Sequence, residues 1–302
     1  MLNGVDVNDN LFGSPQDLFI EDAIAETQVM TTGLSAEYGR FTGGVINAIT
    51  KSGGNTFAGS YRLNLSNPSW TDETPFEEDN DVDLESDLNL TNEMTFGGPL
   101  MQDMLWFFAA GRFANIATSG AFPVTGIPFA TEDKNRRVEI KLTGTPVMNH
   151  SFQFGYLNNH SESVNAPSFD FSIDPTTVVN DQRPNWYTFA NYRGVARGNL
   201  LVEAQYTERR FAFENSGGTD TAIENSPMFH QFQFHYNAPY FDGNDPEQRN
   251  NRQFTASATG FFEGMGRHET KGGFESFRSQ IAGGGGQSAT DFVFYADFLT
   301  DD

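Results

Sequence analysis

Carboxylates and histidines are the side chains of this sequence that could bind a metal ion, and their spacing gives little support for a site. Asp79, Asp81 and Asp83 lie in an acidic run whose oxygens suit a hard cation such as Ca²⁺. The run lacks the spacing and the glycine of an EF-hand loop, so a solvated acidic loop is the favoured interpretation. His230 and His235 fit neither a helical zinc pair nor one face of a strand. We therefore predict no metal and no cofactor, and the three aspartates stay as a weak calcium candidate.

Residues for catalysis are equally hard to find. A carbohydrate-acting enzyme needs two carboxylates facing each other across a cleft, and no feature of the sequence pairs two of its many acids. The glycine run 283–286 has no lysine and helix to cradle a phosphate, so we interpret it as a flexible turn. The pairs Arg136-Arg137 and Arg209-Arg210 are interpreted as interfacial or interior charges rather than anion clamps. We predict that the chain is not an enzyme.

The composition narrows the class of protein. The chain has 302 residues and a formal net charge of -22, which disfavours a nucleic-acid partner because repulsion from the phosphate backbone would be long-ranged. It contains no cysteine, so disulfides and thiolate metal sites are excluded. The mean hydropathy is -0.47, and no apolar run approaches the roughly 20 residues of a spanning helix. Membrane strands that are apolar on one face only are compatible with these values.

Beyond residue 56 the hydrophobic pattern has a period of two. Apolar and aromatic residues alternate with polar or charged ones, as on strands that have one apolar face. The clearest segments are residues 61–66, 87–96, 137–143, 151–156, 200–207, 231–236, 254–262 and 291–298. The alternation predicts an antiparallel sheet of about ten strands, many of them long enough to cross a membrane when tilted.

The connections between these segments are unequal in length. Short turns are expected at residues 97–103 and 144–149, and long polar connections at 67–86, 114–135, 159–184 and 237–251. Short turns at one end and long loops at the other are typical of outer-membrane barrels, although a soluble sandwich can have unequal loops too.

Residues 1–56 have a mixed character. Ser14 is a suitable N-cap and Pro15 suits the first helical position, which predicts a short helix over residues 15–24. Residues 25–31 and 45–50 are predicted strands, and glycines at their joints permit close backbone approach. We expect a compact α/β segment that precedes the sheet.

This junction resembles a known family. Four passages are similar to the end of the plug domain of TonB-dependent outer-membrane receptors, in the form found in the Oar-like group. They are Gln28-Val29-Met30-Thr31, Ala36-Glu37-Tyr38-Gly39-Arg40, Gly43-Gly44-Val45-Ile46-Asn47 and Thr50-Lys51-Ser52-Gly53-Gly54-Asn55. Asn3-Gly4-Val5-Asp6 resembles an earlier plug strand, and Phe96-Gly97-Gly98-Pro99-Leu100 with Asp103 resembles an early periplasmic turn. The match covers about residues 1–115 and is architectural afterwards.

The resemblance implies a fold and a location. It implies a mainly β protein, in which residues 1–56 are the C-terminal part of an α/β plug domain. Residues 57–302 would be the N-terminal part of an antiparallel transmembrane β-barrel. The protein would lie in the cell outer membrane of a Gram-negative type of cell, in contact with its lipid.

The resemblance also implies a function and partners. The protein would take part in energised uptake of an unknown extracellular ligand, such as an iron chelate or an oligosaccharide. The TonB box and the first half of the plug are not found in the sequence, so we expect a fragment without the segment that a TonB-type protein contacts. No covalent chemistry is implied.

The resemblance marks candidate site residues. The plug motif comprises Glu37, Tyr38, Gly39, Arg40, Gly43, Gly44, Asn47, Lys51, Gly53 and Asn55, and the periplasmic turn comprises Gly97, Gly98, Pro99 and Asp103. The barrel interior would carry Arg62, Glu93, Arg112, Glu139 and Lys141. We expect these interior groups to pair with plug charges such as Glu37, Arg40 and Lys51, through hydrogen bonds that can be broken.

A soluble or surface-exposed β-sandwich adhesin is the alternative. It would explain the acidic charge and the alternation, but it leaves the plug-like passage unexplained.

Overall fold

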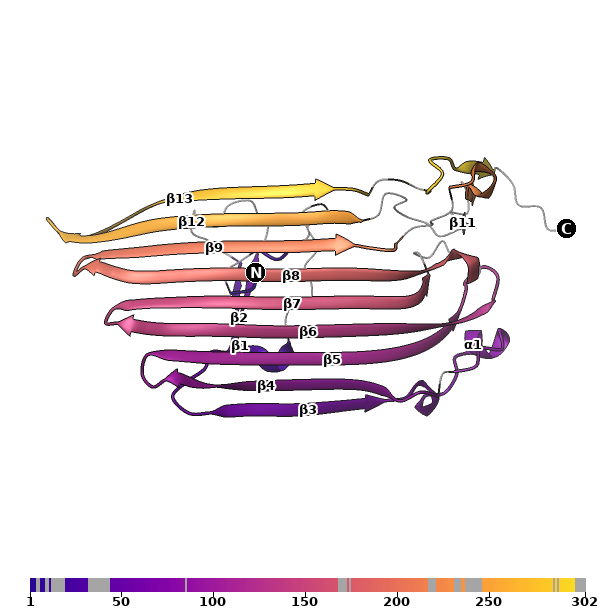
Figure 1. The fold of residues 1–302 in the computed structure, drawn as a ribbon, viewed down its shortest axis with the longest axis horizontal. Coiled ribbons are helices and arrows are strands. Elements are labelled where there is room, and N and C mark those ends of the chain that lie inside the picture. Colours follow the sequence, from indigo (N-terminus) through magenta and orange to yellow (C-terminus); the bar gives the residue numbers. More distant parts are fainter. Residues whose placement is uncertain are drawn as a thin grey trace.

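In the computed structural model most of the chain forms one large antiparallel sheet (Figure 1). The structure describes residues 1–3, 6–8, 11, 20–31, 44–84, 86–167, 173, 175–216, 221–230, 235–236, 246–284, 286 and 288–296. A small two-stranded sheet lies behind the large one in this view. The N-terminal strands and the long sheet therefore belong to separate sheets, which pack against each other.

The large sheet has nine strands in the order β13-β12-β9-β8-β7-β6-β5-β4-β3, with each pair antiparallel. The strands are β3 (Ala58–Ser66), β4 (Asn89–Met101), β5 (Leu105–Ala121), β6 (Pro128–Val147), β7 (His150–Pro167), β8 (Val178–Arg197), β9 (Leu200–Phe213), β12 (Glu247–Glu263) and β13 (Arg267–Ala282). Within the described residues β3 and β13 are the two edges, so the sheet is open. The mainly β fold with a partial barrel is confirmed, with nine strands where about ten were expected.

The N-terminal elements agree with the sequence where they are described. The 3₁₀ helix η1 (Glu21–Ala23) leads into β1 (Ile24–Met30), which pairs antiparallel with β2 (Val45–Thr50). The two predicted strands are confirmed. The predicted helix over 15–24 falls largely on residues 15–19, which lie outside the described residues.

The remaining elements lie in the connections. They are η2 (Pro68–Trp70), α1 (Pro75–Asp79), η4 (Pro175–Thr177), η5 (Ile223–Asn225) and the three-stranded sheet of β10 (Met228–His230), β11 (His235–Tyr236) and β14 (Phe294–Ala296). The segments 231–236 and 291–298 were expected as long strands of the main sheet. That expectation is wrong where the structure describes them, because β11 and β14 join β10 in the small sheet. None of the helices in the described ranges is long and apolar enough to cross a membrane.

The two ends of the large sheet differ, as predicted. Short turns at residues 102–104, 148–149, 198–199 and 264–266 join consecutive strands at one end, on the left of Figure 1. The connections at the other end span residues 67–88, 122–127, 168–177 and 214–246. Asp103 and Asn149 take positive φ angles of 62° and 64° in their turns, a conformation that Asp and Asn tolerate better than most residues.

Two of the predicted long loops are largely strand. Residues 114–121 and 128–135 continue the β5–β6 ladder, and residues 159–167 and 178–184 continue the β7–β8 ladder. Here small or polar residues, such as Ala117, Thr118 and Ser119, occupy both faces, so the alternation of apolar and polar residues disappears from the sequence. The backbone hydrogen bonds persist regardless of polarity, and this explains the difference.

The predicted turn at 97–103 is also shorter than expected. Gly97, Gly98 and Pro99 lie within β4, and of the four turn candidates only Asp103 lies in the turn itself. The β4–β5 register shifts between Pro99 and Met101. Such an irregularity accommodates a proline, which has no N–H to give to the ladder.

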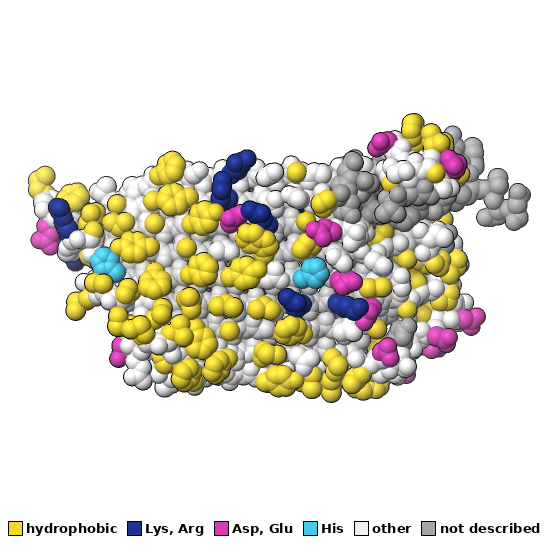
Figure 2. Space-filling model, viewed as in Figure 1, with side chains coloured by type: hydrophobic (Ala, Val, Ile, Leu, Met, Phe, Trp, Pro, Cys, Tyr) yellow, Lys and Arg dark blue, Asp and Glu magenta, His cyan; other side chains and the backbone are white. Residues whose placement is uncertain are grey.

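The two faces of the large sheet have opposite character. One face, here called the interior face, carries buried polar side chains that include Glu93, Thr95, Arg137, Glu139, Lys141, Asn159, Thr207, Arg209 and Asn251. The other, here called the outer face, carries exposed apolar side chains that include Tyr61, Leu63, Leu65, Met94, Phe96, Ile140, Phe154, Tyr156 and Phe254. Figure 2 shows the outer face, with hydrophobic side chains spread over the part next to the short turns. A soluble sandwich buries its apolar face against a second sheet, so this arrangement argues against that alternative.

The linker from β2 to β3 passes very close to β4 and β5. A Cβ on Gly53 would lie 2.1 Å from the carbonyl oxygen of Phe107 and 2.9 Å from that of Gly98. A Cβ on Gly98 would lie 2.2 Å from the ring of Phe57. Glycine at positions 53 and 98 therefore lets the linker run directly against the strands.

Replacing Gly53 by alanine should destabilise the protein, whereas Gly54→Ala should have little effect. The methyl group at position 53 would overlap a carbonyl that is fixed in the β4–β5 ladder, at a cost of about 1–3 kcal/mol. Around Gly54 nothing lies within 4 Å of the same methyl position. The measurement is the temperature at which the detergent-solubilised protein loses its fast migration on an unboiled gel. Equal transition temperatures for the two variants would contradict the close approach.

Candidate functional site at the interior face

The described residues of the first 56, here called the N-terminal segment, lie on the interior face of the large sheet. Two small apolar clusters mark where they pack. Ile20 and Ala23 contact Phe108 and Ala110 of β5. Leu2 and Val7 contact Leu157, Tyr187 and Phe189 of β7 and β8. The N-terminal segment therefore reaches across much of the width of the sheet, and polar contacts lie between and beside these clusters.

The first polar contact joins η1 to β3, β4 and β5. The guanidinium of Arg62 forms ion pairs with Glu93 and, at 3.2 Å, with Glu21. Its Nε lies 3.4 Å from the carboxylate of Asp22. Arg112 completes the group because its Nε donates to the other oxygen of Glu93 at 2.9 Å. Arg62 thus links a buried acid of the sheet to two acids of the N-terminal segment.

The second contact is centred on Lys141 of β6, which is 2 % exposed. Its Nζ donates a hydrogen bond of 2.9 Å to the backbone carbonyl of Thr50, the last residue of β2. Asn3 accepts from the backbone N–H of Thr50 at 3.0 Å and donates to its hydroxyl at 3.2 Å. A charge-assisted bond to a carbonyl therefore holds the end of β2 against the sheet.

The third contact involves β8 and β9. The hydroxyl of Tyr187 donates to the carbonyl of Leu2 at 3.0 Å. Arg209, which is fully buried, donates through Nη1 to the carbonyls of Val7 and Asn8, both at 2.9 Å. Gln205 donates to the carbonyl of Asn3 at 3.5 Å. In this contact all the acceptors on the N-terminal segment are backbone carbonyls.

A fourth group of contacts fixes the linker at the turn end. Asn55 Oδ1 accepts from the backbone N–H of Asp103 at 2.9 Å and from Trp106 Nε1 at 2.7 Å. Its Nδ2 donates to the Asp103 carboxylate at 2.5 Å. Gly53 lies beside Gly97, Gly98 and Phe107 in the same place. The structure thus brings Gly53 and Asn55 of the plug motif together with three of the four candidate turn residues.

The other plug-motif candidates are distributed as follows. Gly44 precedes β2, where a Cβ would lie 3.2 Å from the carbonyl oxygen of Met30. Asn47 lies in β2 opposite Gln28. Lys51 donates to the carbonyl of Asp22 at 2.7 Å, so its contact is within the N-terminal segment and not with the sheet. Glu37, Tyr38, Gly39, Arg40 and Gly43 lie outside the described residues, and so do their expected pairings.

The interior residues expected from the sequence do lie on one face. Arg62, Glu93 and Arg112 form the first contact, and Lys141 forms the second. Glu139 is buried beside them, with an exposed fraction of 3 %. No pattern in the sequence marks Tyr187 or the carbonyls that it and Arg209 bind, because every residue carries a carbonyl.

The acidic run begins at the last residue of a capped helix, α1. The backbone N–H and the hydroxyl of Thr74 both donate to the Glu77 carboxylate at 2.7 Å, and these bonds lower the pKa of Glu77. Asp79 ends α1, and after it the N–H groups of Asp81 and Val82 donate to the carbonyls of Glu78 and Glu77 at 3.4 and 3.0 Å. Among the described residues no three His, Asp or Glu side chains form a group that could hold a metal ion.

His230 and His235 are partners in the β10–β11 ladder.

The arrangement on the interior face serves attachment. Cationic side chains of the sheet hold the N-terminal segment through hydrogen bonds and ion pairs, and two small apolar clusters pack beside these contacts. Polar contacts of this kind can exchange with water at low net cost, whereas a continuous apolar interface would have to expose its surface to separate. The site therefore suits a segment that is held in place but can be released.

We compared the sequence with those of known proteins. No family model matches the sequence. The TonB-dependent transporter Oar of Myxococcus xanthus is 35% identical over 118 residues, which cover 36% of this chain and 11% of the relative. The chain therefore matches only a small part of the length of that relative.

Two solved structures share the fold. The siderophore receptor PirA from Acinetobacter baumannii superposes with a TM-score of 0.59 at 15% identity, over 86% of this chain and 35% of that one. The outer membrane transporter YddB from Escherichia coli superposes with a TM-score of 0.64 at 14% identity, over 93% of this chain and 40% of that one. These comparisons give no support to the adhesin alternative. The chain is thus similar to a TonB-dependent transporter over 118 residues, and it shares its fold with a siderophore receptor and an outer membrane transporter.

Proposed function

We propose that this chain takes part in TonB-dependent uptake across the outer membrane. In this proposal residues 1–56 are the last part of a plug, and residues 57–302 are part of the barrel wall around it. The observation that carries the proposal is the attachment of the N-terminal segment to the interior face through Arg62, Lys141, Tyr187 and Arg209. A wall that is apolar outside and polar inside is what a membrane barrel with a filled lumen requires.

The chemistry of the attachment supports a movable plug. The hydrogen bonds from Lys141 and Arg209 end on carbonyls of Thr50, Val7 and Asn8. A hydrogen bond to a charged group contributes about 1.5–3 kcal/mol. A few such bonds hold the segment firmly at rest, and a pulling partner could break them in succession. Water entering the lumen would then satisfy the released groups.

The proposed partners follow from the family and from the two ends of the sheet. A TonB-type protein would act on the plug from the side of the short turns. An extracellular ligand would bind from the side of the long connections, and its chemical class would be an iron chelate, an oligosaccharide or a similarly large nutrient. The name of PirA as a siderophore receptor favours an iron chelate among these. The proposed role is binding and transport, with no enzymatic step.

The transport proposal is tested by uptake in cells with and without the gene. Labelled ferric chelates, cobalamin and oligosaccharides are offered, and each assay is repeated after the proton gradient of the inner membrane has been collapsed. We expect uptake of at least one compound to need both the gene and the gradient. If no compound shows this double dependence, the proposal fails.

Tethering the N-terminal segment to the sheet should block uptake. The chain has no cysteine, so Asn3→Cys with Gln205→Cys creates a single cysteine pair. These positions are in contact, because the side chain of Gln205 lies 3.5 Å from the carbonyl oxygen of Asn3. Oxidation of this pair in cells should abolish the gene-dependent uptake, and reduction should restore it. The control pair is Asn191→Cys with Gln205→Cys, which joins two neighbouring strands of the wall. Undiminished uptake with the first pair fully oxidised would contradict a movable plug.

Weakening the attachment should open a leak. Lys141→Gln combined with Arg209→Gln removes both charges that bind carbonyls of the N-terminal segment. We expect cells that carry this double variant to become several-fold more sensitive to vancomycin, which the intact outer membrane excludes because of its size. Arg193→Gln is the matched control, because Arg193 pairs with Glu203 across two wall strands at 3.4 Å. Equal sensitivity of the double variant, the control and the parent would show that these bonds do not keep the lumen closed.

A further inference from the structure

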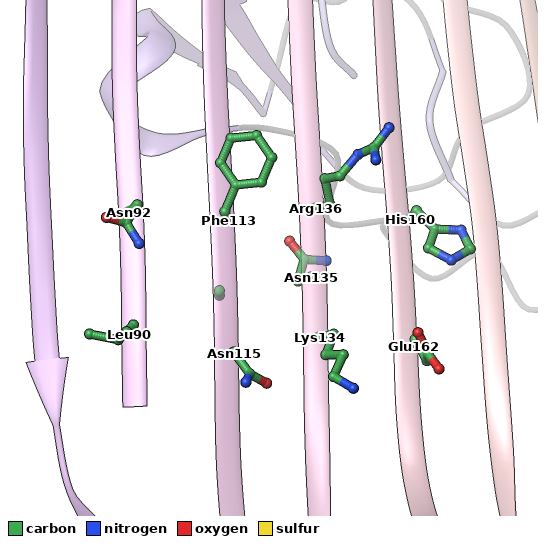
Figure 3. A pocket seen from close by; sticks show the side chains of 10 residues that line it. Leu90, Asn92, Phe113, Asn115, Lys134, Asn135, Arg136, His160 and Glu162 are labelled. Carbon is green, nitrogen blue, oxygen red and sulfur yellow. The ribbon is translucent and has the colours of Figure 1, made fainter. Parts of the chain in front are cut away.

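An open groove lies on the outer face where the apolar surface gives way to polar residues. It has a volume of about 380 Å³ and crosses β4, β5, β6 and β7 (Figure 3). Its lining combines the apolar side chains Leu90 and Phe113 with the amides Asn92 and Asn115 and the charged groups Lys134, Arg136, His160 and Glu162. Because it opens outward, the groove is separate from the attachment site on the interior face.

Two cations occupy the centre of the groove. Arg136 and Lys134 are two residues apart on β6, so they project from the same face, and they extend toward the strand that carries His160 and Glu162 (Figure 3). Arg136 pairs in the ladder with His160, and Lys134 pairs with Glu162. In the part of the chain that the structure describes, Arg136 forms no ion pair. Its planar guanidinium is thus available to bind a phosphate through two hydrogen bonds.

The carboxylates of the groove limit the charge on the ligand. Lys134 Nζ lies 2.8 Å from the Glu132 carboxylate, and Glu162 lies opposite it. These acids offset part of the positive charge, so the groove is not a general anion trap. A ligand must engage Arg136 directly and gain further binding energy from apolar contact.

The surroundings supply that apolar contact. Leu90 and Phe113 are both partly exposed in the groove, at 38% and 39%. Toward the short turns, the next row of outer-face residues contains Met94, and the following row contains Phe96 and Ile140. All three side chains are exposed. Figure 2 shows charged and histidine side chains lying among uncharged ones beyond this hydrophobic area. An amphipathic ligand could place its chains on the apolar area and its head group at Arg136.

A second cation follows the same boundary. Arg210 of β9 lies over the ring of Trp186 of β8, with its Cζ 5.2 Å from the ring centroid. Both are outer-face residues, in the ladder row next to that of Arg136 and His160. Aromatic and basic residues at the edge of an apolar belt are typical of the membrane–water interface. The groove therefore lies at head-group level if the apolar surface lies in the hydrocarbon core.

We propose that this groove binds the phosphate group of an anionic lipid in the outer leaflet. Arg136 and Lys134 bind the phosphate, Asn92 and Asn115 donate further hydrogen bonds to the head group, and Leu90 and Phe113 contact the first part of an acyl chain. This inference rests on the proposed function, in which the chain lies in the outer membrane. It adds a lipid ligand on the outer face of β4 to β7. Charge complementarity and continuity with the apolar belt favour a lipid over a free anion.

The test is native mass spectrometry of the protein extracted from membranes into detergent. The lipid probe is diphosphorylated lipid A, compared with the same lipid after its phosphates have been removed. We expect Lys134→Gln combined with Arg136→Gln to weaken binding of the phosphorylated probe roughly tenfold or more. Arg136→Lys, which keeps the charge but loses the planar fork, should have an intermediate effect. Arg267→Gln is the control, since Arg267 is an exposed arginine beside a short turn.

Two outcomes would overturn the lipid site. One is equal binding of the phosphorylated probe by the parent and the Lys134→Gln/Arg136→Gln variant. The other is binding of inorganic phosphate by the parent as tightly as of the phosphorylated probe, which would indicate a site for a free anion. Fast migration on an unboiled gel reports whether each variant is a folded barrel. If the parent protein does not show fast migration, the outer-membrane fold itself is contradicted. If the parent migrates fast but binds the phosphorylated and the dephosphorylated probe equally, only the lipid site is contradicted.

Discussion

The alternation of side chains along paired strands is the constraint on which the rest of this structure depends. The ladder satisfies the backbone N–H and C=O groups of the inner strands, so the sheet can face a hydrocarbon environment without water. A period of two then commits each strand to one apolar and one polar face. Here the apolar face is exposed and the polar face is buried. The buried polar face needs hydrogen-bonding partners, and the N-terminal segment supplies part of them.

This need explains why the contacts on the interior face are mixed in kind. Arg62 binds carboxylates of η1, whereas Lys141, Tyr187 and Arg209 bind backbone carbonyls. Carbonyls are good acceptors for buried cations, because they compensate part of the lost hydration without adding a second buried charge. They also leave the side chains of the N-terminal segment free for other contacts. The attachment therefore depends on the path of the segment more than on its composition.

The sequence predicts the architecture well, because the strands follow from the alternation of apolar and polar residues. It predicts the contacts poorly, because they depend on the path of the folded chain. The strands could be predicted where one face is apolar, and the prediction failed at residues 114–121 and 159–167, where neither face is continuously apolar. Gly53 and Asn55 could be singled out as motif residues, but their closeness to Gly98 and Asp103 depends on the folded chain. The carbonyls that bind Arg209 leave no mark in the sequence. The ion pair between Arg62 and Glu21 joins two ordinary surface-type residues, so their partnership could not be read from spacing.

The cations of the large sheet lie on both of its faces and have different contacts on each. The chain has only 18 lysines and arginines against 40 aspartates and glutamates, so the positions of its few cations are informative. On the interior face Arg62, Lys141 and Arg209 hold the N-terminal segment. At the edge of the apolar belt Arg136 and Arg210 face outward, where the phosphates of anionic lipids would otherwise repel a protein of net charge -22. Cations at this boundary offset that repulsion locally and leave the acidic connections in water. The same strands thus hold the N-terminal segment on one face and carry the proposed lipid site on the other, because neighbouring residues point in opposite directions.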